Sequence, residues 1–159
     1  MFKIGDNVVY PMHGAGTIVA IEEKEILGNT QKYYVMRLSL GEMKVMIPLD
    51  NAHRVGLRQV IDREEVAEVY DILHKPCTTS SANWNRRYMV NLEKIKTGNV
   101  LEVAEVVKNL LHRDKEKGLS TGEKKMLDSA KQILISELVL AKDQDPDETA
   151  ISIDQVFSS

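Results

Sequence analysis

The chain has 159 residues, room for one ordinary domain or two small ones, and its 43% hydrophobic and 28% charged residues are typical of a protein with a buried core. No apolar run reaches the roughly 20 residues of a membrane-spanning helix, and the start, MFKIGD, has no apolar signal region, so we expect a cytoplasmic protein. A net charge of −3 and a pI near 5.8 argue against strong autonomous DNA binding, which normally depends on a basic domain.

The first 57 residues predict a small β-barrel. The residues VVY before Pro11 are apolar, as is the first half of the segment 17–26, and the glycine-bearing turn HGAG separates the two strand-like segments. Further strands are expected over residues 32–40 and 43–47, where strand-like segments lie between turn signals. Several short strands divided by turns are typical of an SH3-like or Tudor-like barrel, and we assign residues 1–57 to such a domain.

Residues 58–159 predict an all-α domain, which makes the chain an α+β protein of two domains with a boundary near residues 55–61. Apolar side chains recur at helical spacing, and Asn99 and Ser120 each begin a capping pattern with a glutamate three residues later. The expected helices cover residues 62–74, 84–96, 100–117, 120 to about 140, and a short segment near 148–157.

Charge is unevenly distributed over the helical part. Residues 76–142 hold twelve basic and eight acidic side chains, a net charge of +4, whereas the tail of residues 143–159 holds five acidic and no basic ones. A basic block bounded by acidic segments leaves room for a weak contact with nucleic acid that a second partner assists.

Motifs of catalysis and cofactor binding are missing from the sequence. The turn HGAG lacks the Lys-Ser/Thr pair of a phosphate-binding loop, and no G-x-S-x-G or H-x-x-x-H pattern occurs. Cys77 is the only cysteine, which suits a reducing compartment, and neither it nor the four histidines have the spacing of a metal site or a catalytic pair. We therefore expect no enzymatic activity, no cofactor, no bound metal and no small-molecule substrate.

Trp84, the only tryptophan, begins a predicted helix after a loop of small polar residues. One interpretation is a core residue, because Trp84 and Tyr88 share a helix face with two later apolar residues. The other is an exposed residue that stacks on nucleic acid while Arg86 and Arg87 hold phosphates. The helix dipole disfavours basic residues in a first turn by roughly a few tenths of a kcal/mol each, and such a local conflict is a sign of function. The residues alone leave both interpretations open.

Short motifs from the first residues to about residue 140 occur together in one order. They are VVYP and HG near the N-terminus, IP with NA at residues 47–52, VG at 55–56, NW with RRY and NLEK at 83–94, and LS with GEK at 119–124. Each motif is weak alone, but in this order and at this spacing they are specific. On these motifs the chain resembles the CarD/CdnL family of bacterial transcription regulators.

The resemblance implies a Tudor-like N-terminal domain that docks on the β subunit of RNA polymerase, and a helical domain that contacts promoter DNA weakly, in the minor groove and without sequence specificity. In that family the tryptophan matched by Trp84 wedges into the upstream edge of the transcription bubble and stabilises the open complex, and Arg86 and Arg87 match the arginine pair that follows it. Lys24 and Met46 occupy two barrel positions at which some relatives carry arginines that contact polymerase. Lys24 keeps the charge without the planar fork of arginine, and Met46 would make its contact apolar.

Two other functions fit the sequence. The first is a protein-only adaptor that binds polymerase through its barrel while Trp84 lies in the core. The second is a barrel module that binds RNA or the ribosome, although six basic and six acidic residues leave residues 1–57 with no net charge for that purpose.

Overall fold

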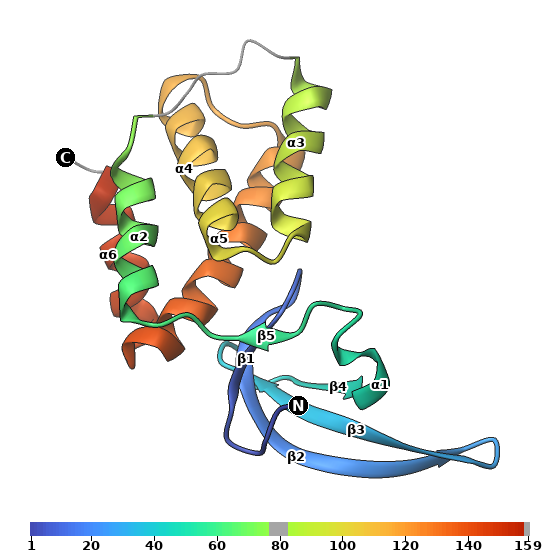
Figure 1. Ribbon diagram of the computed structural model, residues 1–159. Coiled ribbons are helices and arrows are strands. Elements are labelled where there is room, and N and C mark those ends of the chain that lie inside the picture. The colour runs from blue at the N-terminus through green and yellow to red at the C-terminus, as the bar shows by residue number, and fades with distance from the viewer. Residues whose placement is uncertain (77–82, 158–159) are drawn as a thin grey trace.

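The computed structural model describes residues 1–76 and 83–157, and it consists of an N-terminal β-sheet followed by helices (Figure 1). All neighbouring strands are antiparallel, in the order β4-β3-β2-β1-β5. The α+β fold class with two domains is therefore confirmed. The strands are β1 (Asn7–Tyr10), β2 (Gly14–Ile26), β3 (Asn29–Leu38), β4 (Lys44–Pro48) and β5 (Arg58–Gln59), with the short helix α1 (Leu49–Ala52) after β4.

The sheet continues slightly beyond the limit at residue 57 that the sequence indicated. Strand β5 pairs with β1 through Val8 opposite Gln59 and Val9 opposite Arg58. The last strand of the sheet is thus also the start of the connection to the helices, and this makes Arg58 a residue of both domains.

Strands β2 and β3 form a long hairpin whose outer half projects from the sheet (Figure 1). Its two-residue turn, Leu27-Gly28, has φ angles of 53° and 81°, the left-handed geometry that matches the twist of a tight hairpin. Close pairing at the inner end depends on Gly16, because a Cβ there would lie 2.2 Å from the carbonyl oxygen of Arg37. The sheet domain has a hydrophobic core of its own, which consists of Val8, Ile18, Tyr34, Met36, Ile47, Ala52 and Leu57.

The helical domain consists of five helices in the described part of the chain, close to the predicted ranges. They are α2 (Arg63–His74), α3 (Trp84–Lys96), α4 (Val100–Glu116), α5 (Thr121–Lys142) and α6 (Pro146–Phe157). Helix α5 is central, because it contacts the four other helices of the domain and also strand β2. The acidic tail forms α6 and packs into the common core through Ile153 and Phe157. None of the described helices has both the length and the apolar character that a bilayer crossing needs.

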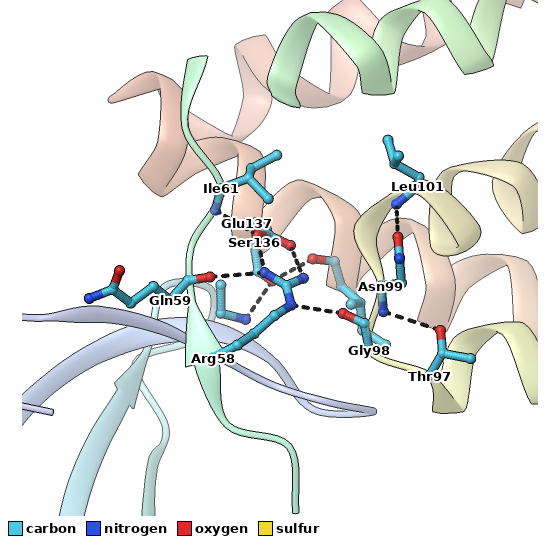
Figure 2. A network of polar contacts seen from close by, with 11 residues as sticks. Arg58, Gln59, Ile61, Thr97, Gly98, Asn99, Leu101, Ser136 and Glu137 are labelled. Carbon is cyan, nitrogen blue, oxygen red and sulfur yellow. Dashed lines mark hydrogen bonds and ion pairs between the residues drawn. The ribbon is translucent and has the colours of Figure 1, made fainter. Parts of the chain in front are cut away.

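A polar network joins the sheet domain to α5 (Figure 2). Arg58 makes a two-pronged contact with Glu137, with nitrogen-to-oxygen distances of 2.7 and 2.8 Å, and its Nε donates to the carbonyl of Gly98 at 2.9 Å. Glu137 is only 2% exposed, and its carboxylate also accepts the backbone N–H of Ile61 at 3.0 Å. A paired, hydrogen-bonded carboxylate in a buried position fixes the geometry of the two groups that it joins.

Ser136, the residue before Glu137 on α5, adds a second link beside this ion pair. Its Oγ accepts the backbone N–H of Ala15 at 2.8 Å, and its backbone carbonyl accepts the hydroxyl of Ser39 at 2.9 Å. Both contacts bring strand β2 and the end of β3 against α5. The sheet domain therefore has a defined orientation on the helices.

Candidate nucleic-acid interface

Helix α3 begins at the tryptophan that the sequence singled out. Asn83 caps the helix, and its side-chain oxygen accepts the backbone N–H of Arg86 at 3.0 Å. The cap satisfies one of the free N–H groups of the first turn and places Trp84 at the first helical position. No acidic side chain lies in this turn, so the two arginines there are not balanced within the turn itself.

Trp84 lies at the surface rather than in the core. It is 41% exposed and lies outside the hydrophobic cluster of the helical domain, to which Ile95, on the same predicted stripe, belongs. The covered side of its ring stacks on Tyr88, with ring centroids 5.2 Å apart and planes inclined by 21°. Burial therefore increases along this stripe of α3, from an exposed tryptophan at its start to a buried isoleucine near its end.

The start of α5 contacts the edge of the indole. Trp84 Nε1 donates a hydrogen bond of 2.8 Å to Ser120 Oγ, and Ser120 also caps α5 by accepting the N–H of Glu123 at 3.2 Å. Beside them, a Cβ added to Gly122 would lie 3.4 Å from the Trp84 ring and 3.8 Å from the Tyr88 ring. Two segments 36 residues apart in the chain thus build one aromatic tip.

The two adjacent arginines have different surroundings. Arg86 is exposed, whereas the Arg87 side chain is only 16% exposed and its Nη2 lies 3.8 Å from the carboxylate of Glu123. Glu123 is 2% exposed and also lies 3.9 Å from Arg113 Nε. Arg87 is therefore directed into the protein, toward a buried anion, and Arg86 is the arginine of the pair that faces solvent.

Other exposed side chains on α3 and at the start of α5 are apolar or basic. On α3, Met89 and Val90 are 54% and 47% exposed. Near the start of α5, Lys124 and Lys125 are exposed as well. An apolar tip bordered by cations can enter a groove of DNA and hold the phosphates on both sides of it.

The two predicted polymerase contacts lie on different strands of the sheet. Lys24 lies in the projecting half of β2 opposite Gln31, and Met46 lies in β4 opposite Val35. Their partners lie four positions apart on β3, about 13 Å along the strand. Both side chains are exposed, and because their partners are four positions apart on β3 they project from the same face of the sheet without forming a single cluster.

Strand β4 is an edge of the sheet, and β5, the opposite edge, leads into the contact with the helices (Figure 1). An edge strand presents free N–H and C=O groups that can pair with a strand of another protein. Met46 therefore lies where a partner strand would add to the sheet.

No metal-binding group of side chains appears among the described residues. Within residues 1–76 and 83–157, no three side chains of His, Cys, Asp or Glu come together as a metal site. His13 packs on Tyr10, and His112 packs edge-on against Phe157. Cys77 lies outside the described residues.

Sequence reasoning identified Trp84 and the arginines but missed what holds them. The capping pattern at Ser120 was visible in the sequence, and its role as the hydrogen-bond acceptor for Trp84 was not. The same is true of Arg87, whose neighbour Glu123 comes from another helix. Local patterns reveal a cap, whereas the contact between α3 and α5 depends on how the helices pack.

The fold and the tip define a two-domain protein, a small β-sheet unit fixed to a helical unit with an exposed aromatic end. Residues 68–154 match the family model described as CarD, C-terminal domain, and residues 2–61 match the model described as CarD-like/TRCF RID domain. The chain belongs to the CarD family.

Relatives of the chain include a full-length bacterial protein and two solved domains. The chain is 49% identical over 142 residues to the "Putative transcription factor YdeB" of Bacillus subtilis (strain 168), which covers 89% of this chain and 93% of that protein. The solution structure of the 72-residue N-terminal domain of Myxococcus xanthus CarD is 32% identical, covering 37% of this chain and 79% of that chain, with a TM-score of 0.33. CdnLNt from Myxococcus xanthus is 40% identical, covering 38% and 86%, also with a TM-score of 0.33.

Proposed function

We propose that this protein is a cytoplasmic transcription regulator that binds the β subunit of RNA polymerase through its sheet domain and stabilises the promoter open complex through Trp84, without catalysing a reaction. Membership of the CarD family, the match to an RID domain and the name of the B. subtilis relative support a role in transcription. The observation that carries the DNA contact is the exposed Trp84, which is held by Ser120 and Tyr88 and lies in the same helical turn as the solvent-facing Arg86.

In this proposal the sheet domain binds polymerase and so places the protein at the promoter. The exposed edge of β4 can accept a strand of the polymerase β subunit, with Met46 in an apolar contact and Lys24 in a charged one. Tethering raises the effective concentration of the helical domain at the promoter. A weak, non-specific contact with DNA is then sufficient, which agrees with the overall acidic charge of the chain.

The tip supplies the preference for open DNA. Inserting an aromatic side chain into the minor groove unstacks a base step, and this costs least where base pairs are already parting. A ligand shifts an equilibrium only by its difference in affinity for the two states, so a wedge at the bubble edge favours the open complex over the closed one. Arg86 and the lysines at the start of α5 hold the flanking phosphates in this arrangement.

The test is Trp84→Ala in a promoter complex with polymerase. We expect the affinity for polymerase to stay within about twofold and the open-complex lifetime to fall by about tenfold or more, because stacking of one aromatic side chain on a base contributes roughly 1–3 kcal/mol. Lifetimes are measured by the decay of competitor-resistant complexes, and polymerase binding is measured without DNA. An unchanged lifetime would contradict the wedge.

The protein-only adaptor remains the alternative, and the indole's contacts with Tyr88 and Ser120 are the observation in its favour. If those contacts were the purpose of Trp84, the same variant would lower the free energy of unfolding by about 3–5 kcal/mol, as for a core aromatic residue. For a tryptophan that is 41% exposed we expect a smaller loss, about 1–2 kcal/mol. Urea unfolding of the same Trp84→Ala protein separates the two functions.

A further inference from the structure

The first turn of α5 forms a seat for the Trp84 indole, built from a hydroxyl, a bare backbone and a buried carboxylate. Ser120 Oγ accepts the indole N–H at 2.8 Å, Gly122 lies beside the ring edge, and Glu123 Oε1 lies 3.4 Å from the same hydroxyl. Each of these residues contributes a different constraint on one side chain.

Ser120 uses its hydroxyl completely. It accepts hydrogen bonds from Trp84 Nε1 and from the backbone N–H of Glu123, and it directs its own hydrogen toward Glu123 Oε1. A hydroxyl has one hydrogen to donate and two lone pairs to accept with, so all three are engaged. The lone pair that faces Trp84 is therefore held in one direction by the helix cap and the carboxylate.

Tyr88 covers one face of the indole, while Ser120 binds the N–H on its edge. A Cβ on Gly122 would lie 3.4 Å from the Trp84 ring, which is ordinary contact, so Gly122 lies beside the ring without pressing on it. Tyr88 covers one ring face at a centroid distance of 5.2 Å. Stacking on one face still permits small rotations about the two side-chain bonds of Trp84, and the hydrogen bond to Ser120 restricts them by holding the N–H edge of the ring.

We propose that Ser120 is a positioning residue that acts through Trp84, holding the indole in one orientation before DNA is met. This inference rests on the proposed function of Trp84 as the wedge. A side chain that is ordered in advance loses less conformational entropy on binding, so the seat strengthens the DNA contact without a new interaction with DNA. Ser120 also caps α5, and the experiment must separate these two roles.

Ser120→Gly and Ser120→Thr separate them. Glycine replaces serine as a helix cap at a cost of only a few tenths of a kcal/mol, roughly, but has no acceptor for the indole, whereas threonine keeps the hydroxyl. We expect Ser120→Gly to shorten the open-complex lifetime by about threefold to tenfold, the effect of one net hydrogen bond, and Ser120→Thr to stay within about twofold of the parent. A threonine variant as short-lived as the glycine variant would overturn the proposal.

A double-mutant cycle with Trp84→Phe shows whether Ser120 acts through the indole. Phenylalanine can still stack on Tyr88 but has no N–H for Ser120 to accept. We expect Ser120→Gly to have no further effect on the lifetime in the Trp84→Phe background, because the two changes remove one interaction. An equal loss in both backgrounds would mean that Ser120 acts through the helix cap alone, and the proposal would fail.

Fluorescence of the free protein keeps the two proposals distinguishable. Trp84 is the only tryptophan, so its time-resolved anisotropy and its quenching by acrylamide report on the indole alone. We expect faster local motion and stronger quenching in Ser120→Gly than in Ser120→Thr, whether or not DNA is involved. Equal anisotropy in the two variants would overturn the proposal that Ser120 orients the indole. A changed anisotropy together with open-complex lifetimes that do not depend on Trp84 would overturn the wedge but keep the role of Ser120.

Discussion

At the scale of single residues, the main outcome is that two neighbouring arginines differ in their surroundings. Arg86 faces solvent, and Arg87 lies near the buried carboxylate of Glu123, which also has Arg113 within 3.9 Å. Separations of 3.8 and 3.9 Å are too long for direct hydrogen bonds, so the attraction is mainly Coulombic. Arg87 therefore lies beside the buried carboxylate of Glu123, and under the proposed function Arg86 is the arginine of the pair that can reach DNA.

We predict that Arg87→Ala lowers the free energy of unfolding by about 1–3 kcal/mol, because it leaves a buried carboxylate with less compensation. Arg86→Ala, the matched control in the same helical turn, should change it by less than about 0.5 kcal/mol. Urea unfolding followed by circular dichroism measures both. If the two variants were equally stable, Glu123 would not depend on Arg87.

At the scale of elements, the sheet offers two features for a partner, the projecting β2–β3 hairpin and the free edge of β4. Lys24 is on the first and Met46 on the second, about 13 Å apart along β3. One added strand along β4 would place a partner beside Met46, while Lys24 would be reached only by a partner that extends along the hairpin. A docked polymerase surface therefore has to be broad to use both residues.

For Lys24→Ala we predict a fall of about threefold to tenfold in affinity for polymerase, mostly as slower association that is more pronounced at low salt, because an exposed rim charge acts mainly through steering. Lys75→Ala, an exposed lysine at the end of α2, is the matched control and should leave the affinity unchanged. Surface-immobilised polymerase and a salt series provide the measurement. Equal affinities for the two variants would remove Lys24 from the docking surface.

At the scale of the whole molecule, the contact between the domains fixes the two proposed binding surfaces relative to each other. Arg58 and Glu137 join the last strand of the sheet to α5 (Figure 2). The same helix is capped by Ser120, which accepts the indole N–H of Trp84. A wedge that must reach the bubble edge from a fixed polymerase contact benefits from a fixed distance between the two ends.

Loss of the charge on Glu137 should loosen that junction. We predict that Glu137→Gln lowers the free energy of unfolding by about 2–4 kcal/mol, somewhat below the usual cost of breaking a buried ion pair because the Arg58 side chain is 30% exposed. Hydrogen exchange of the Ile61 amide, which donates to this carboxylate, should accelerate.

Lys131→Ala, on the same helix, serves as the control for that prediction. It removes the 2.6 Å ion pair with Asp154, a partner whose side chain is 56% exposed, and such pairs contribute about 1 kcal/mol or less. A Glu137→Gln protein as stable as Lys131→Ala would mean that the junction does not depend on the Arg58 contact.

Local patterns alone determined the elements of this protein. The spacing of apolar residues and the caps at Asn99 and Ser120 depend on only a few neighbouring residues, and the longer strands and helices lie close to the ranges expected from them. The expected turn at residues 13–16 was wrong, because residues 14–16 begin β2, and the short elements α1 and β5 were not expected. The tryptophan at the start of α3 and the arginines after it were visible for the same reason.

Tertiary structure decided how those residues are used. The separate surroundings of Arg86 and Arg87, the bond from Trp84 to Ser120, and the lock of Arg58 on Glu137 all join segments that lie 36 to 79 residues apart. Such contacts depend on helix packing and on the register of the sheet against α5. Short-range spacing fixes which face of an element is apolar, but only the packed core fixes which faces meet.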